Sequence, residues 1–541
     1  MLCATRLKKI LLLLIIFCCQ ARAVRAQVLP TAPLVQPPAI DREFRAAWVA
    51  TVANIDWPSQ KGLPVAIQKQ QLTNIVNRAA QLKLNTLLFQ VRPACDALYS
   101  SQIEPWSEFI TGIQGDAPIP AYDPLAYLIH AAHLKGIQVQ AWFNPFRARF
   151  PLSKSPLARN QVIRRHPDWI VHYGDQTWLN PGIPQVQHYV LKIVMDVVKR
   201  YNIDGVHMDD YFYPYPEKSS KGGYLPFNDV TAFSTYKTHG GNLPLNRWRR
   251  HNIDDFVQRL YLHVKAMKPW VLFGISPFGI WQPSHPPTIT GYNSYKMIYC
   301  DSRLWIRNGW CDYLAPQLYW RITQHAQSFP VLLNWWAHQN YKHRHIWPGL
   351  YIDKVNGPPA SGAWPASEIT NEIQITRAVP NSEGAVMFSM VTLLRNGGGI
   401  DNALPQVYRH VALVPSSPWL GMHQPPKPAC KLETDSLTAK ENNQSEVLSW
   451  HTNTSTVTVR WWALQVLSSK GWHTTVLPAD CVSVPLPEGS LEASIIAISP
   501  SGIASPNALV NLRPSTGSGG KRQNHPDGHS TEQFEQTGAS K

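Results

Sequence analysis

The sequence predicts an α/β chain: a (β/α)8 barrel of the TIM-barrel kind, followed by a small all-β module. Eight short apolar runs recur between residues 44 and 390, and segments with helical periodicity separate them. Residues 430–513 instead alternate polar and apolar side chains in steps of two. Strand and helix alternating eight times is the pattern of a (β/α)8 barrel, and period-two alternation is typical of a β-sandwich. A doubly wound open sheet is the structural alternative for the first part.

The eight apolar runs are the expected barrel strands, and each ends in polar or aromatic residues. Their starting points lie 33 to 68 residues apart, which leaves room for one helix and one loop each time. The two longest spacings precede the fourth and fifth runs and predict insertions there. The runs are Phe44–Val52, Thr86–Val91, Ile137–Phe143, Ile203–Met208, Val271–Ile275, Tyr313–Leu318, Ile346–Ile352 and Ala385–Met390.

Four of the segments between these runs predict helices. In the first of them Ile67, Leu72 and Ile75 recur at the spacing of one helix face. A glycine at position 136 ends the second. The expected helices are Ala66–Leu82, Leu125–His133, Val186–Val198 and Asn252–Met267.

The amino terminus is typical of an export signal. A basic start is followed by a ten-residue apolar run and by small residues, so we expect cleavage after Ala23 or Ala26. The run is too short to span a bilayer, and no transmembrane segment is expected elsewhere. A lipid anchor at Cys18 or Cys19 is the alternative, although the residue before each cysteine is bulkier than the small residue typical of a lipobox. We therefore expect a protein exported to the periplasm or cell envelope, or secreted.

Composition divides the rest of the chain. Proline-rich stretches flank the expected barrel, and the last residues are polar and almost devoid of apolar side chains, which predicts disorder. The expected segments are a signal peptide at 1–26, a lead-in at 27–40, the barrel at 41–413, a linker at 414–429, a fibronectin type III-like sandwich at 430–513 and a disordered tail at 514–541.

Composition also excludes some function classes. The chain is 44% hydrophobic and only 16% charged, so it can bury a large core and is not a disordered protein. Cleavage after residue 26 removes five basic residues and no acid, which lowers the net charge from +15 to +10. A net positive charge favours an acidic partner such as an anionic glycan. Export and the lack of a dense basic run argue against nucleic acid.

Five cysteines follow the signal segment. In an oxidising compartment Cys300–Cys311 and Cys430–Cys481 are the sensible pairs, which leaves Cys95 over. Cysteine and histidine spacings do not suggest zinc, so neither a metal nor a cofactor is expected. A calcium site on Asp209 and Asp210 is the alternative.

The side chains just beyond the strand ends are the candidates for function, because catalytic residues of such barrels follow the carboxyl ends of the strands. Aromatic rings stack on sugar faces, while Asn, Gln and Arg bind hydroxyls and carboxylates. The expected substrate-binding residues are Asp56, Trp57, Arg92, Tyr99, Trp142, Asn144, Arg147, His207, Tyr211, Gln317, Tyr319, Trp320 and Tyr351.

The strongest local signal is DGVHMDDY at residues 204–211. Two adjacent carboxylates beside aromatic rings repel and desolvate each other, which raises a pKa into the range of a general acid. Glycoside hydrolysis needs such an acid and a second carboxylate nearby. Asp209 and Asp210 are therefore expected to be catalytic, and Asp96, Asp56 and Asp353 are candidate partners. A structural or metal-binding aspartate pair is the alternative.

Several motifs in order resemble the glycosyl-hydrolase-like family ten. They are REFRAAWVATVANIDWPS (42–59), VRPACDALYSS (91–101), YDPL (122–125), GIQVQAWFNPFR (136–147), NPG (180–182), DGVHMDDYFYP (204–214), SPFGIW (276–281) and DYLAPQLYW (312–320). The resemblance covers about residues 40–413. It implies an exported (β/α)8 hydrolase of peptidoglycan strands that lack stem peptides, and it implies roles for Asp209, Asp210, Arg92, Asp96, Tyr99, Asn144 and Arg147.

We therefore expect a glycosidase that cleaves β-linked amino-sugar strands. Asp209 or Asp210 would be the general acid, with the other or Asp96 as base or nucleophile, and Arg92 and Arg147 would bind lactyl carboxylates. A catalytically inactive glycan-binding protein and a hydrolase of an exopolysaccharide such as poly-N-acetylglucosamine are the alternatives.

Overall fold

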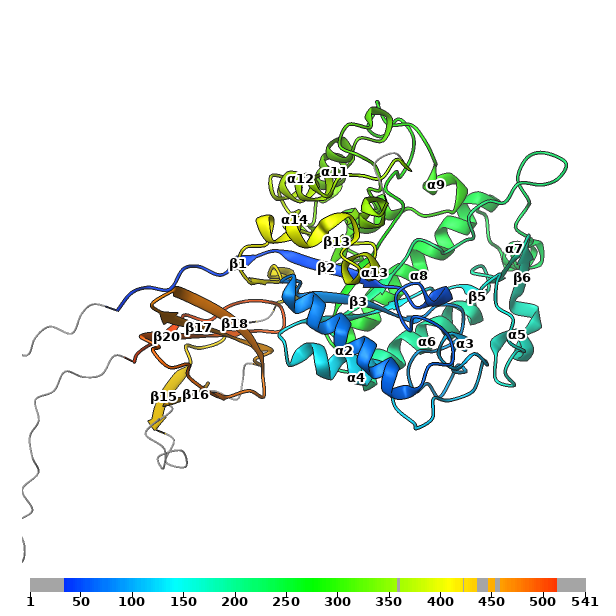
Figure 1. Cartoon of the computed structure of the whole chain (residues 1–541). Helices are drawn as coiled ribbons and strands as arrows, with labels where there is room; N and C mark the ends of the chain where they lie inside the picture. Colours follow the sequence, from blue (N-terminus) through cyan, green and yellow to red (C-terminus); the bar gives the residue numbers. More distant parts are fainter. Residues whose placement is uncertain (1–33, 358–360, 422, 435–445, 453–457, 513–541) are drawn as a thin grey trace, which may run out of the picture. The chain divides into compact units, whose positions relative to one another are not determined.

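The computed structural model describes residues 34–357, 361–421, 423–434, 446–452 and 458–512 (Figure 1). The expected signal peptide, the alternative anchor cysteines and the expected disordered tail lie outside the described residues. Residues 37–541 belong to one compact unit. Within the described part of the chain, no helix is long and apolar enough to cross a membrane.

A curled parallel sheet of nine strands forms the centre of the first part. Its order is β11-β10-β9-β8-β4-β3-β2-β13-β12, so strand neighbours in the sheet mostly follow one another in the chain. Each of the eight apolar runs contributes to it. The strands are β2 (Phe44–Val49), β3 (Thr86–Arg92), β4 (Gln138–Phe143), β8 (Gly205–Met208), β9 (Leu272–Ile275), β10 (Tyr313–Leu314), β11 (His345–Ile346), β12 (Gly349–Leu350) and β13 (Gly384–Met387).

The two edge strands of this sheet are consecutive segments of the chain. Only Trp347 and Pro348 separate β11 from β12, yet β11 pairs with β10 and β12 pairs with β13. A parallel bridge between Gln317 and Gly349 continues the pairing on the β10 side. The seventh apolar run is thus a strand interrupted in its middle, and the sheet curls round into a barrel-like form.

Side chains of this sheet alternate between two apolar clusters. Phe44, Ala46 and Trp48 of β2 belong to an inner cluster, while Ala47 and Val49 belong to the larger cluster that includes the helices. Alternation follows because successive side chains of a strand point to opposite faces. Both faces of the sheet are therefore buried, which explains why the strands read as nearly continuous apolar runs.

Helices cover the outer face of the sheet. The expected helices form nearly where predicted, and α2 buries Leu72, Ile75 and Ala79 at helical spacing. The helices are α2 (Val65–Gln81), α3 (Glu108–Thr111), α4 (Pro124–His133), α5 (Val162–Arg165), α6 (Pro184–Arg200), α7 (Val230–Thr238), α8 (Leu245–Met267), α9 (Ser294–Met297), α10 (Ser302–Asn308), α11 (Phe329–Gln339), α12 (Ala366–Arg377), α13 (Met390–Leu394) and α14 (Ile400–Val407).

The two long spacings carry insertions, as predicted. A small antiparallel sheet follows β4 in the order β5 (Arg147–Arg149), β7 (Gln176–Leu179), β6 (Ile170–Tyr173). The segment between β8 and α8 contains a bridge from Lys218 to Tyr224 and helix α7. Both insertions follow carboxyl ends of strands, and they are therefore placed to flank a site there.

The last part of the chain is all-β. A sheet of three antiparallel strands has the order β15-β16-β19, and one of four has the order β18-β17-β20-β21. The strands are β15 (Ala429–Thr434), β16 (Glu446–His451), β17 (Trp461–Ser468), β18 (Gly471–Pro478), β19 (Ser483–Pro485), β20 (Glu492–Ile498) and β21 (Ala508–Asn511). The expected disulfides do not form, because Cys300, Cys311, Cys430 and Cys481 are all free thiols.

An ion-pair cluster joins the all-β part to the amino end of the curled sheet. Arg460, next to β17, lies 2.6 Å from Asp204 at the start of β8 and 3.2 Å from His133. His133 in turn lies 2.9 Å from the second oxygen of Asp204. Burial opposes the charge of Asp204, but Arg460 and His133 outweigh it and lower its pKa to about 2.

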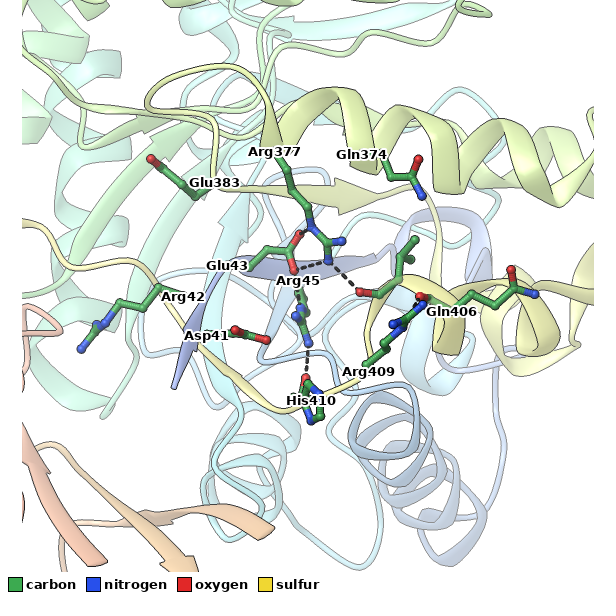
Figure 2. Close-up of a pocket in the computed structure, with 11 residues that line it drawn as sticks. Asp41, Arg42, Glu43, Arg45, Gln374, Arg377, Glu383, Gln406, Arg409 and His410 are labelled. Atoms are coloured by element: carbon green, nitrogen blue, oxygen red, sulfur yellow. Dashed lines mark hydrogen bonds and ion pairs between the residues drawn. The ribbon is translucent and has the colours of Figure 1, made fainter. Parts of the chain in front are cut away.

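A cavity of about 560 Å³ opens at the amino ends of β2 and β13, where Figure 2 shows Glu43 between two guanidinium groups. Glu43 accepts hydrogen bonds of 2.7 Å from both Arg45 and Arg377. Arg45 also donates to the carbonyl of His410 and Arg377 to that of Val407. Both guanidinium groups of this cluster are paired with Glu43, and their bonds to the two carbonyls tie the end of α14 and the segment after it to β2.

Candidate active site

Two adjacent buried aspartates follow strand β8 at the carboxyl end of the curled sheet. Asp209 is 3% exposed and Asp210 is not exposed at all. Residues 205–208 pair with β4 on one side and β9 on the other, so the chain holds the aspartates at the middle of the sheet edge. Two buried carboxyl groups in sequence need strong stabilising contacts or protons, because burying bare charges is costly.

Asp209 has three long hydrogen-bond contacts and one nearby cation. Trp142 Nε1 lies 3.3 Å and Asn144 Nδ2 3.4 Å from its Oδ2, and the Tyr211 amide lies 3.4 Å from its Oδ1. Burial raises the pKa of Asp209 to about 7; Arg147 opposes this shift and Asp210 adds to it. Asp209 therefore holds a proton up to near neutrality, as a general acid must.

Asp210 is held by closer contacts. The Tyr215 hydroxyl donates a hydrogen bond of 2.5 Å to Oδ2, and Gln317 Nε2 lies 3.4 Å from Oδ1. Gln317 also donates 2.9 Å to the carbonyl of Ser276, which fixes its amide. Burial raises the pKa of Asp210 to about 6, although the bonds from Tyr215 and Gln317 oppose it.

His207 lies inside the curled sheet beneath the aspartates. Its Nδ1 lies 2.8 Å from the Tyr313 hydroxyl, which donates to Gln140, and its Nε2 lies 3.1 Å from Trp48 Nε1. Because the indole can only donate, Nε2 accepts and Nδ1 carries the proton. Burial lowers the pKa of His207 to about 3, so the ring is neutral. The ring has no exposed surface and packs in the interior beneath the pair, and its expected role in substrate binding stays a prediction.

Half-buried aromatic rings and one arginine surround the aspartate pair. The Arg147 guanidinium lies 4.9 Å from the centre of the Tyr211 ring, and Tyr319 lies 4.8 Å from Tyr351. The described residues include no ion-pair partner for Arg147 within 4 Å. The expected residues that the structure gathers here are Trp142, Asn144, Arg147, Tyr211, Gln317, Tyr319, Trp320 and Tyr351.

Arg92 is not available to bind a ligand beside the aspartate pair. Its side chain has no exposed surface and pairs with Glu104 through bonds of 2.7 and 2.6 Å. It also donates to the carbonyls of Asn144 and Pro145. In this arrangement Arg92 is engaged by Glu104 and ties the ends of β3 and β4 together, so its guanidinium is not open to a substrate carboxylate.

The other acidic candidates belong to separate clusters. Asp96 is 2% exposed, bonds to Ala94 and Ser107, and faces Glu104. Asp56 accepts from the Ala50 and Val391 amides and from the Ser389 hydroxyl. Asp353 likewise accepts from Ser389 and Thr392. These three carboxylates anchor loops, and among the described residues no hydrogen bond links them to the Asp209–Asp210 pair. The catalytic role expected for Asp96 and the binding role expected for Asp56 stay predictions.

Two expected aromatic contacts are core residues. Trp57 is fully buried and donates to the carbonyl of Gln68. Tyr99 is 1% exposed and packs edge-on against Tyr201 at 5.8 Å. Neither ring can stack on a sugar in this arrangement.

Tyr215 was missed by the sequence reasoning. Its signal was available in the run DDYFYPYP, because a phenol a few residues after two carboxylates can fold back on them. Phe278 and Tyr292 extend the aromatic cluster around it, with ring centres 6.4 and 5.3 Å from that of Tyr215. As for metals, the described part of the chain brings no three His, Cys, Asp or Glu side chains together in a way that could hold an ion.

Comparisons with known proteins show the family to which the chain belongs. Residues 43–364 match the model of the family described as Glycosyl hydrolase-like 10. Glycosyl hydrolase YngK of Bacillus subtilis (strain 168) is 37% identical over 80% of this chain and 84% of its own. Glycosyl hydrolase DigH of Escherichia coli (strain K12) is 34% identical over 70% and 91%. The PgaB (BpsB) glycoside hydrolase domain of Bordetella bronchiseptica is 13% identical, with 69% and 100% coverage and a TM-score of 0.43.

Proposed function

The chain belongs to the glycosyl hydrolase-like 10 family and is a glycosidase, and we propose that it cleaves β-linked amino-sugar glycans at the Asp209–Asp210 pair. Peptidoglycan strands that lack stem peptides are the proposed substrate. The observation that carries the proposal is the pair itself: two adjacent buried carboxyl groups whose pKa values rise to about 7 and about 6.

The chemistry of glycoside hydrolysis matches such a pair. One carboxyl group must protonate the leaving oxygen, and a second must act as base, nucleophile or charge stabiliser. With pKa values on either side of pH 6.5, one of the two groups is protonated and the other ionised near neutrality. The pair is therefore suited to acid–base catalysis without a cofactor.

The surroundings of the pair support a saccharide with anionic groups. Tyr211, Tyr319 and Tyr351 offer half-buried rings, which suit the apolar faces of sugars. Arg147 offers a guanidinium that no described carboxylate pairs with, and a lactyl carboxylate of muramic acid fits that geometry. The positive net charge of the chain favours the same kind of polymer.

We also propose the finer architecture and location. The curled sheet and its helices are interpreted as a (β/α)8 barrel at 41–413, and the all-β part at 430–513 as a fibronectin type III-like module after a linker at 414–429. The export signal at 1–26 places the enzyme in the cell envelope. A lipid anchor remains the alternative to a soluble envelope protein.

The test compares three polymers and three proteins. Wild type, Asp209→Asn and Asp210→Asn are incubated with amidase-treated peptidoglycan, intact peptidoglycan and poly-N-acetylglucosamine, and released fragments are identified by mass spectrometry. We expect fragments from the amidase-treated strands, with at least a hundredfold loss in either variant, because general acid–base groups contribute about 10²–10⁴-fold. Asp168→Asn, at an exposed acid, is the matched control and should retain activity.

Two outcomes would contradict the proposal. Binding to the stripped strands without any released fragment would favour the glycan-binding alternative. Release from poly-N-acetylglucosamine alone would keep the hydrolase and replace the substrate.

A further inference from the structure

The shortest contact of the aspartate pair is made by a tyrosine. The Tyr215 hydroxyl lies 2.5 Å from Asp210 Oδ2, which is the length of a charge-assisted O–H···O⁻ bond. A phenol holds its proton far above neutral pH, and burial next to Asp210 raises the pKa of Tyr215 further. Tyr215 is therefore the donor, and Asp210 must present an unprotonated oxygen to it.

The other oxygen of Asp210 is also approached by a donor. Gln317 Nε2 lies 3.4 Å away and is oriented by its 2.9 Å bond to the Ser276 carbonyl. An amide nitrogen can only donate. Both oxygens of Asp210 thus face donors, and the 2.5 Å bond from Tyr215 is much shorter than any bond that Asp209 accepts, which favours the ionised form of Asp210.

Asp209 has a different environment. Its three donors, from Trp142, Asn144 and the Tyr211 amide, lie at 3.3 to 3.4 Å and make weak bonds. The nearest cation is Arg147, which lies over the Tyr211 ring and makes no ion pair with Asp209 within 4 Å among the described residues. These weak bonds stabilise the ionised form of Asp209 less, which favours its protonated form.

We infer that Tyr215 is a positioning residue that keeps Asp210 ionised, so that Asp209 carries the proton donated to the leaving oxygen. The inference rests on the proposed glycosidase function for its kinetic part. Proton count is conserved: Tyr215 keeps its own proton throughout, and the proton transferred to the leaving group comes from Asp209 and returns to it from water.

Other titratable groups also face the pair, and none of them replaces Tyr215. Asp210 is acted on by four phenols and a thiol that remain neutral near pH 7, because burial raises the pKa of each. These groups are Tyr211, Tyr215, Tyr292, Tyr319 and Cys300. Asp209, which carries the proton in this inference, and the Arg147 guanidinium are the other titratable groups beside them. Tyr215 alone among the phenols donates a hydrogen bond to Asp210 in the described residues.

The kinetic test is the pH profile of Tyr215→Phe. In the wild type, the acidic limb of the profile follows the ionisation of Asp210 and the alkaline limb that of Asp209. Losing one hydrogen bond to a carboxylate should move the acidic limb up by about 1–2 pH units. Because the two limbs then overlap, the maximal rate should also fall about threefold.

Tyr292→Phe is the matched control. Tyr292 lies in the same aromatic cluster, 5.3 Å from the Tyr215 ring centre, but its buried hydroxyl bonds to no described residue. Removing it should leave the acidic limb in place. An unchanged profile in Tyr215→Phe, or an equal shift in both variants, would overturn the inference.

A second measurement separates this inference from the proposed function. Carboxyl ¹³C shifts of aspartate-labelled wild type, Asp209→Asn and Asp210→Asn assign the two titrations without any substrate. As the pH rises, we expect Asp210 to ionise at a lower pH than Asp209. The opposite order would overturn the inference even if hydrolysis is observed. If no glycan is cleaved, the proposed function fails while this titration still decides which aspartate keeps the proton, and the same titration of Tyr215→Phe decides the role of Tyr215.

Discussion

Replacing Asp209 by Asn should make the protein progressively more stable than the wild type as the pH rises. Burial raises the folded pKa of Asp209 from 3.8 to about 7. A carboxyl group with a raised folded pKa contributes its full stability below pH 3.8 and loses it as the pH rises through 7, because the unfolded chain ionises more easily. An asparagine has no such charge to bury.

The size of the effect follows from the two pKa values. Between pH 5 and pH 8 the advantage of Asp209→Asn should grow by about 2–3 kcal/mol, at 1.36 kcal/mol for each pH unit of unequal ionisation. The effect levels off above pH 8, where both states are ionised. Repulsion from Asp210 is already part of this raised pKa.

Urea unfolding followed by tryptophan fluorescence at pH 5, 6.5 and 8 measures this difference. Asp168→Asn is the control, because an exposed acid should change the free energy of unfolding by less than about 0.5 kcal/mol at every pH. A stability difference for Asp209→Asn that stays constant or shrinks towards pH 8 would refute the reasoning. It would mean that Asp209 is ionised at low cost in the folded protein and is unsuited to hold the catalytic proton.

Two further predictions concern the basic residues. Arg92→Ala should lower the free energy of unfolding by about 3–5 kcal/mol, because it leaves the buried Glu104 carboxylate without its cation. Arg147→Ala should change the free energy of unfolding by less than about 1 kcal/mol and should raise KM for an anionic glycan about tenfold or more. The reverse pattern in denaturation and kinetics would restore Arg92 as the binding group. Arg460→Ala should cost about 2 kcal/mol or more at pH 7 and less as the pH falls towards 2, since the lowered pKa of Asp204 supplies stability above pH 4 that protonation removes. An equal loss at acid and neutral pH would contradict the ion-pair explanation.

The strand and helix pattern was predictable because its causes are local. Strand β2 shows why: Phe44, Ala46 and Trp48 face one cluster and Ala47 and Val49 the other, so both faces are apolar and the run reads as buried. The interruption between β11 and β12 was not predictable. It arises from Pro348, which offers no N–H, together with pairing to two different strands.

The candidate site was predictable only in part. Asp209 and Asp210 stand out because two carboxylates directly follow an apolar strand, and that pattern needs no distant information. Arg92 has the same appearance in sequence as Arg147, since both follow a strand and precede aromatic or polar residues. The difference is the partner: Glu104 pairs with Arg92, whereas Arg147 lies over the Tyr211 ring and makes no ion pair within 4 Å among the described residues.

The sequence by itself determined the order of strands and helices, the family, and the pair of carboxylates at the carboxyl end of β8. These depend on hydrophobic periodicity and on residues adjacent in the chain. The tertiary structure decided which polar side chains are paired inside the protein and which can contact a substrate. Whether a carboxylate keeps its proton depends on burial and on donors from elsewhere in the chain, as with Gln317 on Asp210, and those contacts form only when the sheet curls.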